Sequence, residues 1–182
     1  MSRSKKLIVT ALFLIGACIL LYPAVSNKLA ERHQAEMISR YEQTVEELPK
    51  TDMKSEWEKA VKYNESVTGM SVEDPFILGS GSVLPGNYKD VLNVEEKEGV
   101  MGYIEIPAID VMLPIYHGVS ERVLRRGVGH METTALPIGG KGTHSVLASH
   151  RGLSTAKLFT DLDRMKGICF ISMYWIIFLL MR

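Results

Sequence analysis

The 182-residue sequence predicts a mainly β domain, built as a barrel or sandwich decorated by helices, behind N-terminal helices and one membrane-spanning helix. Three observations lead to this fold class: an uncharged apolar run near the N-terminus, a glycine-free helical region after it, and short segments of period two beyond residue 99. Lys+Arg and Asp+Glu each number 21, so the formal net charge is zero. A nucleic-acid-binding protein would need a positive surplus, and nucleic acid is therefore excluded as a partner.

The N-terminus predicts a transmembrane anchor. Basic residues within 1–6 precede an uncharged run over 7–26, which at 1.5 Å per residue can cross a hydrocarbon core of about 30 Å. The positive charge predicts that residues 1–6 stay in the cytoplasm as a tail and that the bulk of the chain lies outside the cell membrane. A cleaved secretory signal is the alternative, because Ala24 and Ser26 are small enough for a processing site. We prefer the uncleaved anchor, because the run exceeds the roughly 7–15 residues of a signal's apolar region.

Residues 27–68 predict a helical region. The segment is rich in Glu and Lys and lacks glycine, and Pro49 divides it into two helices. The second helix is expected to begin around Thr51, with Ser55 and Glu58 at capping-box spacing as an alternative start. The first helix carries an apolar stripe, at spacings of three and four, that must pack on something: Met37, Ile38, Tyr41, Val45 and Leu48.

Residues 69–98 predict a loop and a linker. Glycine, proline, serine and aspartate dominate the composition of 69–86, and long ordered loops in compact domains are usually functional. At the centre of this loop, Asp74, Pro75 and Phe76 place an aromatic tip beside an acid. The plainer alternative is a proline turn whose phenylalanine anchors the loop to the core.

Residues 99–167 predict the β domain, because the apolar period there changes to two. Glycine and proline end each short segment, and a serine is placed to cap a brief helix. The expected elements are a strand over 102–106 ended by Pro107, a strand over 112–116, a helix capped by Ser120 that stops at Gly127, a strand over 143–150, and a helix from Ser154 or Thr155 through Met165.

The side chains that could support chemistry are few. Only two cysteines occur, Cys18 and Cys169, and both lie in apolar runs, which excludes a disulfide framework. The predicted strand over 143–150 would place His144 and His150 on one face, but no third ligand is suggested nearby, so no metal site is expected. No phosphate-binding glycine loop, HExxH or GxSxG motif is present.

His150 is the histidine that best suits catalysis. It is expected to end a strand directly before Arg151, where a side chain can project from a barrel rim into a groove as a general acid or base. His33 is expected to be solvated on its helix. His117 and His130 are expected in loops, with a surface or hydrogen-bonded role.

Four motifs in order then resemble the first half of a class C sortase, a pilin-polymerising transpeptidase of Gram-positive cell surfaces. They are GVGH over 127–130, LPIGG over 136–140, THSVLASHRGL over 143–153 and AKLF over 156–159. The resemblance implies a partial sortase-type β-barrel in which His150 matches the family's catalytic histidine. It also implies that Asp74, Pro75 and Phe76 form the family's lid over the active-site groove.

The resemblance implies a membrane-anchored enzyme that needs no cofactor. Such an enzyme cleaves LPxTG-type sorting signals through a cysteine thiolate and joins pilin subunits through a lysine, while an arginine steadies the substrate. The family's nucleophilic cysteine, within Thr-Leu-x-Thr-Cys, and its catalytic arginine are absent from these residues. Cys18 lies in the apolar span and Cys169 among apolar residues, while Arg125, Arg126 and Arg151 do not match the family's arginine.

We therefore expect a sortase truncated after its first half and inactive. Strands of half a barrel would lack partners, so instability or aggregation is also expected. The alternative is a non-catalytic, membrane-anchored binding protein for pilin or for an active sortase.

The apolar tail over 168–182 has two interpretations. The literal one is a tail helix or a membrane hairpin, which would make a two-pass membrane protein. The other is a frameshift: moved back by one base, the codons of residues 173–176 must read Val-Leu-Asp, and the preceding codons permit Gly-Asp-Leu-Phe-Tyr-Ile-His. The composite alternates like a strand. We therefore hypothesise that the residues after Gly167 are an out-of-frame translation of a sortase strand.

Overall fold

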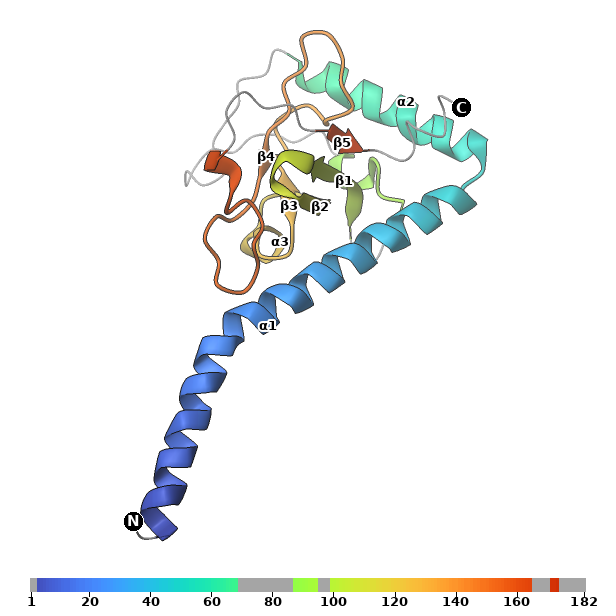
Figure 1. Ribbon diagram of the computed structural model, residues 1–182. Helices are drawn as coiled ribbons and strands as arrows, with labels where there is room; N and C mark the ends of the chain where they lie inside the picture. The colour runs from blue at the N-terminus through green and yellow to red at the C-terminus, as the bar shows by residue number, and fades with distance from the viewer. Residues whose placement is uncertain (1–2, 69–86, 95–98, 165–170, 174–182) are drawn as a thin grey trace.

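The computed structural model describes residues 3–68, 87–94, 99–164 and 171–173. A long helix α1 (Arg3–Glu47) and a second helix α2 (Lys50–Val67) precede a five-stranded sheet of order β4-β3-β2-β1-β5, as Figure 1 shows. The strands are β1 (Val100–Ile106), β2 (Val111–His117), β3 (Val128–His130), β4 (Leu147–Ala148) and β5 (Ile171–Met173). A short helix α3 (Glu121–Leu124) and three single-turn 3-10 helices (Tyr88–Asp90, Pro107–Ile109 and Leu162–Arg164) complete the described elements.

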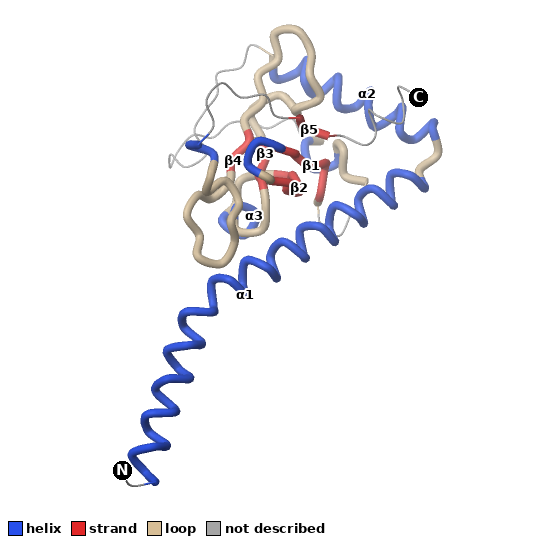
Figure 2. The backbone as a smooth tube through the Cα atoms, in the orientation of Figure 1, coloured by secondary structure: helices blue, strands red, loops and turns tan. Residues whose placement is uncertain are grey.

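Helix α1 joins the predicted span and the predicted first helix without a break. Its first half projects from the globular part in Figure 2. The most apolar 18-residue window has a mean hydropathy of 2.4 with none of it buried, so by length and composition this helix could cross a membrane. The second half packs on the sheet through one stripe, which confirms the predicted apolar face: Gln34, Met37, Ile38, Tyr41 and Val45 are buried.

The predicted helix break at Pro49 is confirmed. Helix α1 ends at Glu47, and Pro49 occupies the position before α2 with φ −59° and ψ 143°. A proline disfavours helical geometry in the residue before it, which explains the break. The alternative start at Ser55 is wrong, because Ser55 lies inside α2.

Two buried contacts fix α2 against the domain. The side-chain amide of Asn64 donates to the carbonyl of Leu136 at 3.1 Å and accepts from its backbone N–H at 2.7 Å. The hydroxyl of Tyr63 donates to the carbonyl of Glu132. The helix therefore holds the segment between β3 and β4 through backbone groups of that segment.

The first predicted strands are confirmed. Strands β1 and β2 pair antiparallel, with Ile104 opposite Leu113, and Asp110 makes the turn with a left-handed φ of 52°. The predicted cap of α3 is also present, because the Ser120 hydroxyl accepts from the backbone N–H of Val123 at 3.4 Å.

Strand β3 was not expected. It pairs in parallel with β2, in the register Ile115 to Val128, after the chain has crossed over through α3. Its three residues are too few for a period-two pattern to be recognised.

The predicted strand over 143–150 is wrong except at Leu147–Ala148. The backbone before β4 instead bonds to the irregular segment after β3: Ala135 N–H donates to the His144 carbonyl at 2.9 Å, and Met131 N–H to the Val146 carbonyl at 3.0 Å. The hydroxyl of Thr134 accepts from Val146 N–H at 3.1 Å, so a side chain replaces a ladder partner.

The predicted helix from Ser154 or Thr155 through Met165 is also wrong. Turns and the 3-10 helix Leu162–Arg164 occupy its described part. Leu158 has a left-handed φ of 41°, which ends any helix that begins before it.

The tail contributes a strand to the sheet. Strand β5 pairs antiparallel with β1, in the register Tyr103 to Met173 and Ile104 to Ser172. A tail helix is therefore wrong for 171–173. The predicted lid with Asp74, Pro75 and Phe76, the remaining tail and Cys169 lie outside the described residues.

Both long helices contribute buried side chains to one core with the sheet. β1 is buried on both faces except at Glu105, which is half-buried. The core is thus built from helix and strand together, on a central β1–β2 hairpin. Its largest fully buried side chains include Tyr41, Tyr63, Met101, Ile106, Ile115 and Leu136.

Candidate active site

His150 lies two residues beyond β4, not within a strand. Its side chain is 30% exposed, and its Nε2 is 3.2 Å from the Glu121 carboxylate. The backbone is fixed on both sides, because the Ser149 hydroxyl donates to the Gly127 carbonyl at 2.6 Å and Phe159 N–H donates to the His150 carbonyl at 3.2 Å. The imidazole is therefore accessible on an anchored stretch of backbone.

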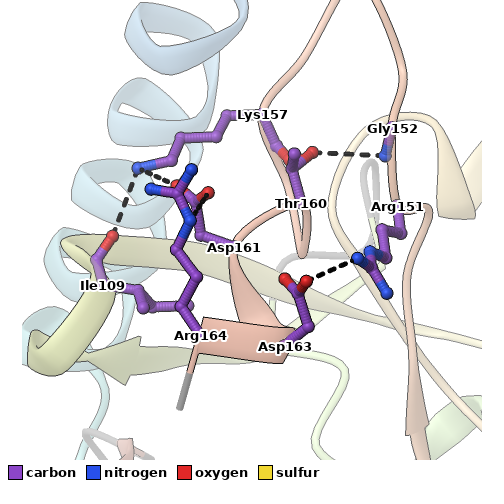
Figure 3. Close-up of polar contacts among 8 residues, drawn as sticks. All are labelled: Ile109, Arg151, Gly152, Lys157, Thr160, Asp161, Asp163 and Arg164. Atoms are coloured by element: carbon purple, nitrogen blue, oxygen red, sulfur yellow. Dashed lines mark hydrogen bonds and ion pairs between the residues drawn. The ribbon is translucent and has the colours of Figure 1, made fainter.

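The loop after His150 is closed by polar contacts (Figure 3). Arg151 pairs with Asp163 at 2.7 Å, and Gly152 N–H donates to the Thr160 hydroxyl at 3.2 Å. Further along, Asp161 pairs with a lysine and an arginine, each at 3.1 Å: Lys157 and Arg164.

Lys157 also joins this loop to the β1–β2 turn. Its ammonium donates to the Ile109 carbonyl at 3.2 Å (Figure 3). These contacts restrain the backbone that follows His150 at several points, so the histidine does not sit at the start of a free loop.

Glu121 is the group that orients the His150 ring. The Arg125 guanidinium donates to its carboxylate at 2.7 Å, and this bond, together with the nearby His150, lowers the pKa of Glu121. An ionised carboxylate can only accept a hydrogen bond. The proton in this contact therefore belongs to Nε2 of His150, and Nδ1 is the basic nitrogen when the ring is neutral.

His144 and His150 are not joined by one continuous strand. The backbone between them is strand only at Leu147–Ala148, so the regular strand on which the predicted alternation depended is absent there. Among the described residues, no group of three His, Cys, Asp or Glu side chains is placed to hold a metal ion.

His130 is a structural histidine, at the end of β3 rather than in a loop. It is completely buried, with Nδ1 3.0 Å from the Tyr88 hydroxyl and Nε2 2.9 Å from the Ala135 carbonyl. Burial lowers the pKa of His130 to about 4, so the ring is neutral at pH 7. The Tyr88 hydroxyl also accepts from Gly118 N–H at 3.0 Å, which ties β3 to the residue after β2.

His117 is likewise structural and ends β2. Its Nε2 lies 2.8 Å from the Val91 carbonyl and its Nδ1 3.2 Å from the Gly99 carbonyl. Burial lowers the pKa of His117. His33, on α1, is exposed as expected and lies 3.4 Å from the Arg126 guanidinium. Both histidines expected in loops are thus strand residues, and the hydrogen-bonded role is confirmed for each.

The other residues singled out in the sequence are distributed as follows. Cys18 is exposed on the projecting half of α1, far along the chain from His150. Arg125 and Arg151 are held by Glu121 and Asp163, and Arg126 lies over the Tyr116 ring at 5.4 Å.

Sequence reasoning missed Glu121 as the neighbour of His150. Its spacing of four from Arg125 predicts that ion pair, but nothing local predicts an approach to a residue 29 positions later. Thr160 and Asp163 were missed for the same reason, because a helix was expected where they close a loop.

The comparisons with known proteins concern the family and the fold. A family model described as a sortase domain matches residues 104–171. Sortase C1 from Streptococcus agalactiae is 36% identical with a TM-score of 0.64, over 76% of this chain and 69% of that protein. A sortase C from Streptococcus pneumoniae, described in connection with catalysis and pilin substrate specificity, is 38% identical with a TM-score of 0.63, over 75% and 67%.

A second pneumococcal protein, sortase C-1, is 35% identical with a TM-score of 0.60, over 75% of this chain and 69% of its own. No protein with curated function matches the chain. The match spans about two thirds of the length of these three relatives. Their sequence identities of 35–38% indicate a common family as well as a common fold. The predicted sortase-type fold is therefore confirmed, and the chain belongs to the class C sortases.

Proposed function

We propose that this chain carries the histidine half of a sortase-type transpeptidase that acts on LPxTG-type sorting signals and joins pilin subunits through a lysine. The observation that carries the proposal is the placement of His150, accessible and oriented by Glu121 on a backbone anchored at both sides. The relatives support the same conclusion, since one of them is described by its pilin substrate specificity.

In this proposal His150 moves the proton in both halves of the reaction. In its charged form it donates a proton to the amine released from the Thr-Gly bond, and in its neutral form it accepts one from the incoming lysine amine. The hydrogen bond to the Glu121 carboxylate keeps the ring in one orientation.

We further propose that these 182 residues alone do not catalyse transpeptidation. A sortase needs a thiolate within reach of the histidine, and Thr-Leu-x-Thr-Cys does not occur in the sequence. Cys18 lies in the run over 7–26 that is proposed to cross the membrane. A non-catalytic role in binding pilin or an active sortase is the alternative outcome.

We propose that residues 7–26 anchor the protein in the cell membrane, with residues 1–6 in the cytoplasm and the domain outside. The support is the exposed, uncharged run over 7–26 within α1 and the basic residues that precede this run. Pilin subunits that carry sorting signals are then partners on the outer surface, and Asp74, Pro75 and Phe76 are proposed to cover the groove beside His150.

We also propose that the tail beyond Gly167 is an out-of-frame translation. The support comes from the sequence, because the codons of residues 173–176, moved back by one base, must read Val-Leu-Asp, and the composite with the preceding codons alternates like a strand. If no single-base change near codon 167 opens a continuation with Thr-Leu-x-Thr-Cys, the proposal is wrong.

The experiment compares the chain as given with the frame-restored chain, both purified in detergent micelles. A labelled LPxTG peptide and a lysine-bearing acceptor peptide are the substrates, and product is followed by chromatography. We expect no turnover from the 182-residue chain and turnover from the restored chain.

In the restored chain, His150→Ala is expected to abolish product formation, whereas His33→Ala, a change at an exposed histidine on α1, is expected to retain it. Sustained turnover by the chain as given, or by the restored His150→Ala variant, would contradict the proposal.

A further inference from the structure

The loop after His150 touches α1 at the last residue of the uncharged run. The Ser26 hydroxyl donates to the Thr155 carbonyl at 3.2 Å, across 129 positions of sequence. In Figure 1 this loop lies beside α1, at the end of the helix's contact with the domain. No spacer therefore separates the apolar half of α1 from the folded domain.

Further contacts fix the domain to α1 immediately beyond this point. The Gln34 side-chain amide donates to the Arg126 carbonyl at 3.2 Å. Asn27 and Ala30 line a pocket of about 250 Å³ together with Asp110 and Lys157, so the β1–β2 turn and the loop after His150 both face this stretch of helix. The domain is thus held in one orientation relative to the helix.

Helix geometry sets the depth of the loop. The twenty residues of the uncharged run span about 30 Å, which fills a hydrocarbon core, and the headgroup layer adds roughly 5–8 Å on each side. Ser26 then lies at the edge of the hydrocarbon. The backbone of Thr155, in hydrogen-bond contact with Ser26, lies within the headgroup layer.

The chemistry of the loop suits that layer. Residues 151–160 contain two basic side chains, Arg151 and Lys157, and no acidic one. Ser154 is exposed at the tip, next to Thr155. The nearest acids, Asp161 and Asp163, are each paired with a cation of the same loop. Because these ion pairs neutralise the acids, the loop does not repel phosphate groups, and its exposed hydroxyl can donate a hydrogen bond to phosphate oxygens.

We propose that the loop over 151–160 rests on the phosphate-bearing headgroups of the bilayer, so that the membrane forms one wall beside the His150 site. The inference rests on the membrane anchoring proposed above. Because His150 and the loop are joined by the Phe159 N–H bond to the His150 carbonyl, lipid contact restrains the segment that positions the imidazole.

The test measures depth by fluorescence quenching in the full-length chain. Cys18 and Cys169 are replaced by serine, and an environment-sensitive dye is attached to Ser154→Cys or, as the matched control, to Lys54→Cys. Lys54 is exposed on α2. Helix α1 continues for about 30 Å beyond Ser26 before α2 begins, so Lys54 is expected to lie well away from the headgroups. The chain is reconstituted into phosphatidylcholine–phosphatidylglycerol vesicles that carry a quencher on lipid headgroups of both leaflets, so the direction of insertion does not matter.

We expect headgroup quenching to be several-fold stronger at Ser154→Cys than at Lys54→Cys. Equal quenching at the two sites, in protein that resists alkaline extraction from the vesicles, would overturn the inference and leave the anchor intact. Release of the protein by alkaline extraction would overturn the anchor itself and the inference with it.

Discussion

The buried His130 ring makes the stability of the protein depend on pH. Its pKa in the folded state is about 4, against an ordinary value of 6.5, because burial disfavours the charged ring. The unfolded chain therefore binds this proton more tightly than the folded one. The stabilisation is complete above pH 6.5 and is lost as the pH falls toward the folded pKa of about 4.

The difference between the two pKa values fixes the size of the effect. Full protonation of His130 lowers the free energy of unfolding by about 3 kcal/mol. About 2 kcal/mol of this loss occurs between pH 7 and pH 5. Domains are typically stable by only about 5–15 kcal/mol, so a loss of this size is easily measured.

The assay is urea unfolding of the full-length chain in detergent micelles, followed by near-UV circular dichroism of the buried tyrosines. The wild type is compared with His130→Gln, which removes the titrating ring while His117 titrates in both proteins. We expect the wild type to lose about 2 kcal/mol more than the variant between pH 7 and pH 5. An equal loss in both proteins would refute the account of His130.

Two further changes test the packing around the site. Asn64→Ala removes the side-chain acceptor of the buried Leu136 N–H, while the Leu136 carbonyl keeps its bond from Ile138 N–H, and the change is expected to cost about 1–3 kcal/mol in urea unfolding. Lys54→Ala at an exposed position is expected to change little. Gly129→Ala would place a Cβ against a backbone carbonyl oxygen and is expected to lower the melting temperature sharply. Gly16→Ala, where nothing lies within 4 Å, is expected to leave it unchanged, and equal effects of the two glycine variants would contradict this packing.

Local patterns were sufficient for the elements that follow a regular period. The apolar stripe of α1, the break at Pro49 and the hairpin of β1 and β2 each depend on residues close in sequence, and each was predictable. The Ser120 cap is of the same kind.

Segments held by distant partners were not predictable in this way. The stretch before β4 is held by hydrogen bonds to backbone and hydroxyl groups of residues 131–135 and does not pair as a regular strand. Leu158 adopts a left-handed conformation that its own side chain disfavours, and only the closed loop after His150 requires it.

The same distinction between local patterns and distant partners applies to the candidate site. His150 was predicted as the candidate from its motif, whereas its neighbour Glu121 belongs to another element, α3, and is found only in the folded chain. The buried network of Tyr88 and His130 was missed because period-two reasoning does not detect a three-residue strand.

The most direct test of the central claim is the intact mass of the 182-residue chain after incubation with an LPxTG-type peptide. An acyl-enzyme would increase the mass by the acyl fragment of the peptide, since a thiolate attacks the Thr-Gly amide and the amine leaves. The account predicts an unchanged mass, because His150 has no thiol partner among the described residues. A stable mass increase that Cys169→Ser removes would contradict it.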